Sequence, residues 1–114
     1  MCGAGTLAIE AALIATKRVP GLLRDNYAFM HILDFERSMY LDERAKLEDE
    51  IIQIPNLKII ASDISEKAIN IARINAEAAG VDHLIDFEVC DFEDTSIPEG
   101  DGVVMFNPEY GERL

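Results

Sequence analysis

Four residues near the end of the chain, Asn107-Pro108-Glu109-Tyr110, combine groups that could hold a planar amine. They follow an apolar run, 102–106, which is typical of a buried strand. The Asn107 side-chain oxygen and the Pro108 carbonyl could accept both hydrogens of an exocyclic amine, which would favour a more nucleophilic nitrogen. Tyr110 could stack on a base once that base is flipped out. The alternative interpretation is an ordinary Asn-Pro turn after a strand.

A second candidate site lies at the start of the chain, where Cys2-Gly3-Ala4-Gly5-Thr6 leads into an Ala- and Leu-rich helical pattern over 7–15. Gly3 and Gly5 would let the backbone turn tightly and approach a ligand with no Cβ in the way. The helix amino terminus would present N–H groups to that ligand. A Gly-x-Gly pair alone is weak evidence, because many helices begin after glycines.

An acidic residue ends the next predicted strand. Asp63 closes the run 57–63, and Ser65 is then suited to cap a helix over 66–79 that stops at Gly80. An acid at the end of the second strand of a dinucleotide-type fold commonly holds ribose hydroxyls. Asp63 could instead be a second helix cap, and the two roles are compatible.

A third predicted strand, 84–92, also ends in an acid, Asp91, followed by Phe92. These two residues would suit the amino group and ring face of an adenine, whereas Asp91 taken alone would more often be a solvated turn residue. Apolar and polar residues alternate along 85–90, which favours a strand at the edge of a sheet. The run 103–106 is apolar throughout, as in a strand covered on both faces.

Together these segments resemble the THUMP-associated RNA guanine-N2 methyltransferases, a family that modifies ribosomal and transfer RNA. The resemblance covers essentially the whole chain, and the combination of motifs is specific. The segments that carry it are 1–6, 20–22, 29–35, 62–65, 75–76 with 79–81, and 107–114.

The resemblance implies an α/β fold, the Rossmann-like class I methyltransferase fold, with sheet order 3-2-1-4-5-7-6. Residues 1–114 would form a partial S-adenosylmethionine-dependent methyltransferase domain with an insertion at about 18–55. Family members begin this fold with a strand that ends just before the position of Met1. That first strand, the later strands and the RNA-binding THUMP domain are expected to be absent from this chain.

The resemblance also implies S-adenosylmethionine as the cofactor and assigns the site residues. The residues expected to contact the cofactor are Cys2, Gly3, Ala4, Gly5, Thr6, Asp63, Ile64, Asp91, Phe92 and Asn107. The residues expected to hold the target guanine are Asn107, Pro108 and Tyr110. No metal is expected, because no His/Cys cluster has the spacing of metal ligands.

Two residues depart from the family pattern. Glu109 stands where the family has a second proline, so the loop loses a rigid ring and gains an anion beside a site for a base. Ala4 stands where the family usually carries a serine, which removes one hydroxyl.

Three hypotheses about function remain open. The leading hypothesis is an RNA guanine-N2 methyltransferase acting on ribosomal RNA, with the isolated chain inactive. The second is a catalytically dead nucleoside-binding or interaction module. The third is a methyltransferase of DNA adenine-N6 or protein glutamine, which would share the Asn-Pro-x-Tyr element.

Composition bears on the partners of the chain. Its 22 acidic and 10 basic residues give a formal charge of −12, so the isolated chain should bind RNA poorly, and the full-length enzyme would need a basic domain to do so. The start of the chain lacks the pattern of a signal peptide, and no apolar run approaches the ~20 residues of a membrane span. Two cysteines are too few for a disulfide scaffold, so a cytoplasmic protein is expected. Unpaired strand edges around the missing first strand predict a homo-oligomer.

Overall fold

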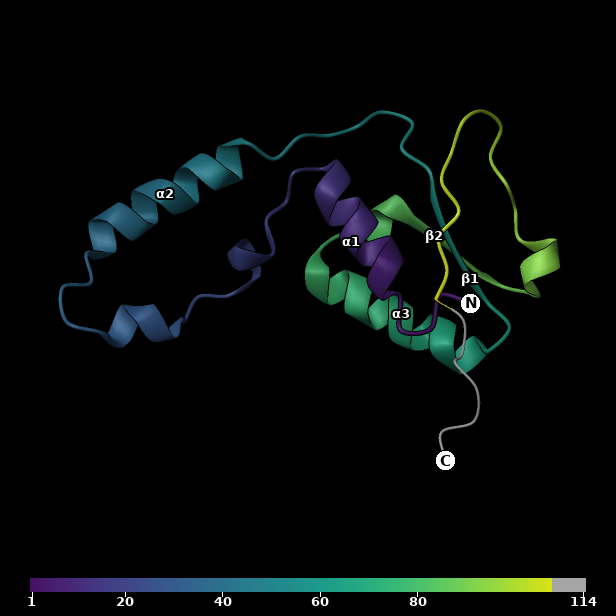
Figure 1. Cartoon of the computed structure of the whole chain (residues 1–114), viewed down its shortest axis with the longest axis horizontal. Helices are drawn as coiled ribbons and strands as arrows, with labels where there is room; N and C mark the ends of the chain where they lie inside the picture. The colour runs from purple at the N-terminus through teal and green to yellow at the C-terminus, as the bar shows by residue number, and fades with distance from the viewer. Residues whose placement is uncertain (108–114) are drawn as a thin grey trace. The chain divides into compact units, whose positions relative to one another are not determined.

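The structure, a computed structural model, describes residues 1–107 and divides into two compact units (Figure 1). One unit combines Met1–Ala12 with the described residues from Asn56 onward, and the other is Leu13–Pro55. Across residues 1–107, no helix has both the length and the apolar character needed to cross a membrane.

The first unit contains a β-α-β element. Strand β1 (Ile59–Asp63) leads into helix α3 (Glu66–Ala79), and the chain returns as strand β2 (Ile85–Val89) beside β1. The two strands are parallel, with Ala61 opposite Phe87 at their centre. The predicted second and third strands are therefore neighbours, as the expected sheet order requires, although both strands are shorter than predicted.

Helix α3 begins and ends where the sequence predicts. The Ser65 hydroxyl accepts the Ala68 N–H at 3.3 Å, which satisfies one of the amide groups that the first turn leaves without an acceptor. Gly80 ends the helix at φ 69°, a left-handed conformation that glycine adopts at little cost. The buried residues of the helix are Ile69, Ala72, Ala76 and Ala79. The three alanines are small and allow other segments of the unit to approach the helix closely.

The glycine loop lies on the edge of β1 that faces away from β2. The Cys2 N–H donates to the Ser62 carbonyl at 2.7 Å, and helix α1 (Thr6–Ala15) follows the loop. In the expected sheet order the first strand also lies on this edge. The loop is therefore on the side of β1 on which the resemblance predicts it.

The predicted fourth strand is not formed. Residues 103–106 have no strand structure, and their side chains are between 59% and 85% exposed. An extended segment becomes a strand only where its backbone groups pair with a neighbour, and β1 and β2 pair only with each other among residues 1–107. The prediction of a buried strand at this run is therefore wrong for the described residues.

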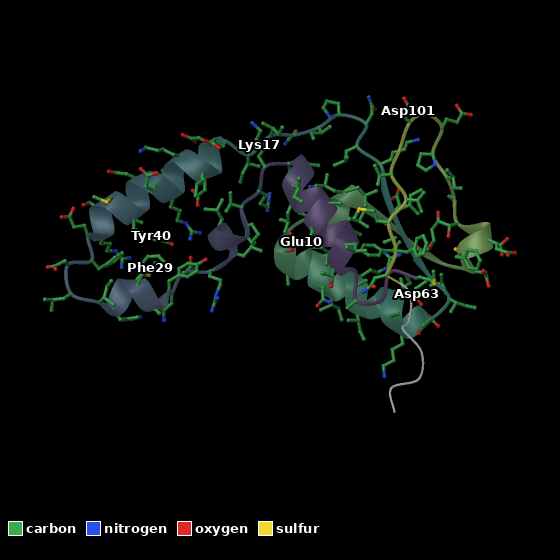
Figure 2. All side chains as sticks on the ribbon, viewed as in Figure 1. Glu10, Lys17, Phe29, Tyr40, Asp63 and Asp101 are labelled. Atoms are coloured by element: carbon green, nitrogen blue, oxygen red, sulfur yellow. The ribbon has the colours of Figure 1, made fainter. Side chains whose placement is uncertain are left out.

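The second unit is small and held by one arginine and a group of aromatic rings. Helix α2 (Arg37–Asp49) follows two short 3-10 turns, η1 (Pro20–Leu23) and η2 (Ala28–His31). Arg44 of α2 donates to the carbonyls of Leu22 and Arg24 and also to the Tyr40 hydroxyl and the Glu48 carboxylate; the relevant distances lie between 2.9 and 3.2 Å. The rings of Phe29 and Tyr40, labelled in Figure 2, have centroids 6.0 Å apart. None of the predicted site residues lies in this unit.

Candidate functional site

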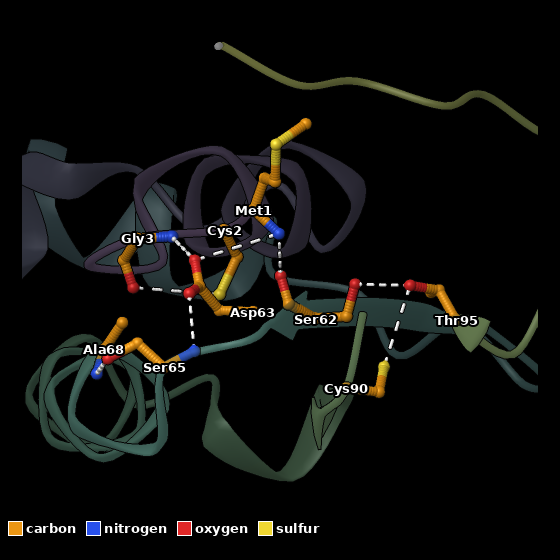
Figure 3. Close-up of polar contacts among 9 residues, drawn as sticks. All are labelled: Met1, Cys2, Gly3, Ser62, Asp63, Ser65, Ala68, Cys90 and Thr95. Carbon is orange, nitrogen blue, oxygen red and sulfur yellow. Dashed lines mark hydrogen bonds and ion pairs between the residues drawn. The ribbon is translucent and has the colours of Figure 1, made fainter. Parts of the chain in front are cut away.

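The site is organised around the Asp63 carboxylate, at the carboxyl end of β1 (Figure 3). One oxygen, Oδ2, accepts the Gly3 N–H at 3.0 Å, and the other, Oδ1, accepts the Ser65 N–H at 3.0 Å. Its side chain is only 15% exposed. Asp63 therefore joins the glycine loop to Ser65, the residue that caps α3, and does not itself cap the first turn of that helix.

The hydrogen bonds to Asp63 keep its carboxylate ionised. Burial raises the pKa of this carboxyl, but the N–H groups of Ser65 and Gly3 stabilise the charged form and outweigh burial, so the pKa is lowered. The Met1 ammonium, 3.8 Å from Oδ2, acts in the same direction and also donates to the Ser62 carbonyl. A fixed, charged acceptor thus lies at the end of the strand.

The glycines at positions 3 and 5 are required by the loop for different reasons. Gly3 has φ 55° and no neighbouring atom within 4 Å of the place a Cβ would occupy, so the space beside it is open. Gly5 has φ 84°, and a Cβ there would lie 2.9 Å from the Ala72 Cβ, which is too close. The loop is therefore packed on α3 at Gly5 and open at Gly3. The Gly5 carbonyl accepts the Ile9 N–H at 2.9 Å, so α1 begins directly after the loop, and its first-turn amides have no acceptor within the helix.

Cys2 is half-buried between the glycine loop and β1. Burial raises the pKa of its thiol, and the neighbouring negative charge of Asp63 raises it further. Its sulfur lies 3.7 Å from the Gly3 carbonyl. The raised pKa favours the protonated form of this thiol.

The loop after β2 begins beside Asp63, because the Cys90 N–H donates to the Asp63 carbonyl at 3.1 Å. The Asp91 side chain caps the short turn η4 (Phe92–Asp94) by accepting the Glu93 N–H at 3.2 Å. This is the turn role that the sequence left open for Asp91, and the remaining lone pairs of the carboxylate still allow another donor. The exposed apolar side chains of Ile64 and Phe92, 73% and 63% accessible, follow β1 and β2 respectively.

Two polar contacts of the site were not anticipated from the sequence. The Asn75 side chain of α3 donates to the Ala4 carbonyl at 2.9 Å, and the hydroxyls of Ser62 and Thr95 lie 2.7 Å apart. Asn75 lies in a segment that carries the family resemblance, and this was the only sequence signal for it. Its distance along the chain from the glycine loop does not predict that the two are in contact. Thr95 had no such signal.

The target-binding side of the site is described only in part. Asn107 is exposed and lies in a segment without regular structure. Pro108 and Tyr110 lie outside the described residues, as does Glu109. Of the remaining predicted cofactor residues, Ala4 and Thr6 are exposed in the loop and at the first position of α1.

Comparison with known proteins places the chain in a family. A family model described as the RMKL-like methyltransferase domain matches residues 1–114. The chain belongs to this family. The chain is therefore part of a methyltransferase domain, as the resemblance implied.

Curated relatives agree over the whole chain. The ribosomal RNA large subunit methyltransferase K/L of Photobacterium profundum is 40% identical over 119 residues, and that of Pseudoalteromonas atlantica is 42% identical over 118. All of this chain is covered in both comparisons, but only 17% and 16% of the relatives. The chain thus spans about a sixth of their length.

Solved structures confirm the fold. SMU.472, which carries a provisional methyltransferase assignment and was crystallised in complex with SAH, superimposes with a TM-score of 0.90 at 31% identity. A provisionally assigned methylase from Clostridium difficile 630 gives 0.89 at 39% identity. Each comparison covers 100% of this chain and 30% of the other. The structure is thus part of a Rossmann-like methyltransferase fold.

Proposed function

We propose that this chain is the S-adenosylmethionine-binding part of an RNA methyltransferase that modifies the exocyclic N2 of guanine in ribosomal RNA. Family membership and the names of the curated relatives support an enzyme of ribosomal RNA. The complex of SMU.472 with SAH, the demethylated form of the cofactor, supports S-adenosylmethionine. Guanine-N2 as the target comes from the resemblance to the THUMP-associated enzymes.

The Asp63 carboxylate is the observation that carries this proposal. It is charged, largely buried and held by two backbone N–H groups, so little reorganisation is needed when a ligand arrives. A carboxylate has about four acceptor positions, and two remain after these bonds. They suit the two hydroxyls of a ribose, which are donors carried on adjacent carbons.

The surroundings of Asp63 fit the rest of the cofactor. The open space at Gly3 and the first-turn amides of α1 suit the carboxylate of its amino-acid end, because helix amino termini attract anions. Ile64 and Phe92 offer apolar surface to adenine, and Asp91 can accept from its amino group. When bound, the cofactor supplies an electrophilic methyl group on a sulfonium.

Asn107, Pro108 and Tyr110 would act on the target. The Asn107 side-chain oxygen and the Pro108 carbonyl accept the two hydrogens of the guanine amine, and Tyr110 stacks on the base. This arrangement orients the nitrogen lone pair towards the methyl group. The cofactor would supply the methyl group to this nitrogen and leave as SAH, and the proton displaced from the nitrogen would pass to solvent.

Cofactor binding is tested by titrating the purified chain with SAH in a calorimeter. We expect binding by the wild type and a loss of affinity on the order of tenfold to a hundredfold in Asp63→Asn, because a charge-assisted hydrogen bond to the ribose is removed. Asp86→Asn is the matched control, since Asp86 is an exposed aspartate in β2 and loses the same charge. A folded wild type that gives no heat at millimolar SAH, or equal losses in the two variants, would contradict the proposal.

The isolated chain is expected to transfer no methyl group to RNA. Its charge of −12 opposes contact with phosphates, and Glu109 adds an anion to the target-binding loop. Radiolabelled methyl incorporation into ribosomal RNA by the 114-residue chain would refute this expectation. In a longer protein that contains this domain, Glu109→Pro should raise the rate of incorporation if the missing ring matters, and an unchanged rate would show that it does not.

A further inference from the structure

Helix α3 holds the glycine loop at two places on one face. Ala72 packs against Gly5, and Asn75, three residues later, donates its side-chain N–H to the Ala4 carbonyl at 2.9 Å. Residues three apart lie side by side on a helix surface, so both contacts come from the same stripe of α3. In Figure 1 the loop between the N-terminus and α1 passes across α3.

These contacts hold the peptide group between Ala4 and Gly5 from both sides. Its carbonyl accepts from Asn75, and its N–H, which belongs to Gly5, donates to the Cys2 carbonyl at 3.0 Å. Because a peptide group is planar, bonds at both ends fix its orientation and prevent it from flipping. Without the Asn75 bond, this peptide would be held at its N–H end alone, and Gly5, which borders it, has the backbone freedom to let it turn.

The orientation of this peptide determines where the next amides point. The Gly5 carbonyl accepts the first hydrogen bond of α1, from the Ile9 N–H. The first-turn N–H groups of Thr6 and Leu7 come directly after Gly5, so their positions depend on how Gly5 is held. On the other side, the Gly3 N–H is already held by Asp63. Without the Asn75 anchor, the loop could shift on α3 and carry the first turn of α1 with it, while the bond from Gly3 to Asp63 stayed in place.

We propose that Asn75 is a positioning residue for the cofactor: it holds the Ala4–Gly5 peptide so that the first turn of α1 meets the amino-acid end of S-adenosylmethionine. This inference rests on the proposed function. Asn75 and Ala4 are both exposed, so their hydrogen bond contributes little to the stability of the fold. Its consequence is expected in ligand affinity, and only for ligands that carry the amino-acid end.

The test compares Asn75→Asp with Asn70→Asp in the purified chain. Aspartate has the shape of asparagine but presents an acceptor where the amide N–H was, so it faces the Ala4 carbonyl with like charge. Asn70 is an exposed residue of the same helix and gains the same charge, which makes it the matched control. The two ligands are SAH, which has the amino-acid end, and adenosine, which lacks it.

We expect Asn75→Asp to raise the Kd for SAH by about threefold to tenfold, the range of one net hydrogen bond, and to leave the Kd for adenosine unchanged. Asn70→Asp should leave both within twofold of the wild type. Asn75→Gln retains an amide donor on a longer stem and should recover part of the SAH affinity; it also replaces the aspartate variant if that one fails to fold.

Three results would overturn the inference. SAH affinity in Asn75→Asp equal to that of the wild type would show that the bond does not position the cofactor. Equal losses for SAH and adenosine would assign Asn75 to the general stability of the unit. A folded wild type that binds no SAH would remove the proposed function and this inference together, so the two failures are distinguishable.

Discussion

The Ser62 hydroxyl lies 2.7 Å from the Thr95 hydroxyl, joining the end of β1 to the segment that follows η4 (Figure 3). Ser62 precedes Asp63, and Thr95 comes four residues after Asp91, so this one contact relates the two acids predicted to bind the cofactor. The Cys90 thiol is 3.8 Å from the same Thr95 oxygen. The next residue, Ser96, donates its N–H to the Glu88 carboxylate at 3.0 Å, which lowers the pKa of that carboxyl.

Replacing Thr95 should separate the effect of its hydroxyl from that of its shape. Thr95→Val keeps the branched side chain but removes the bond to a partly buried Ser62, so we expect a loss of about 1 kcal/mol in the free energy of unfolding. Thr95→Ser keeps the hydroxyl and should stay closer to the wild type. Urea denaturation provides the measurement. If the valine variant were as stable as the serine variant, the hydroxyl pair would contribute nothing to the fold.

Alanine substitutions should rank the glycines by their environment. Gly5→Ala would place a Cβ at a residue with φ 84° and only 2.9 Å from the Ala72 Cβ. Its free energy of unfolding should therefore fall by more than the about 1–2 kcal/mol that a left-handed conformation alone costs. Gly3→Ala has open space around the new Cβ, so its free energy of unfolding should fall only by the cost of the left-handed conformation. Gly102→Ala, with open space and no positive φ, is the control and should stay within about 0.5 kcal/mol of the wild type. Thermal denaturation measures all three, and equal losses at Gly3 and Gly5 would argue against the close approach to α3.

The lowered pKa of Asp63 predicts how stability depends on pH. A carboxyl whose pKa is lower in the folded state stabilises the fold fully above its unfolded-state pKa, about 3.9, and loses that contribution as the pH falls through the folded value. The difference in unfolding free energy between the wild type and Asp63→Asn should thus be constant near neutral pH and shrink below about pH 4. Urea denaturation across this range gives the difference. A gap of the same size at pH 2.5 and pH 7 would be inconsistent with a charged, hydrogen-bonded Asp63.

The exposed apolar run 103–106 predicts that the isolated chain associates with itself. Val103 and Val104 are 85% and 81% exposed, and contiguous apolar surface of this kind seldom stays uncovered. We expect light scattering to give a mass above one chain, rising with salt as the negative charges are screened. Val104→Lys should reduce the mass, while Ile97→Lys, at another exposed apolar residue, should not. A monomer at high concentration and high salt would contradict this expectation.

Local signals in the sequence were sufficient for helix α3. A hydroxyl at Ser65, a helical pattern and Gly80 each act within a few residues, so both ends of Glu66–Ala79 could be predicted without knowing what the helix packs against. The end of the strand at Asp63 could also be predicted, because the capping residue of the next helix follows two positions later. The motifs also indicated the methyltransferase family, because their order along the chain is itself part of the sequence.

Only the tertiary structure decided which of these segments touch. The bond from Gly3 to Asp63 joins residues 60 apart, and that from Asn75 to Ala4 joins residues 71 apart; no pattern along the chain encodes such distances. The run 103–106 shows the reverse case: its composition predicts a strand, yet a strand also needs a neighbour with unpaired backbone groups. Side-chain type is a property of a single residue, whereas pairing is a property of two segments brought together by packing. The acids and glycines of the candidate site could therefore be predicted from the sequence. The contacts that hold them could not.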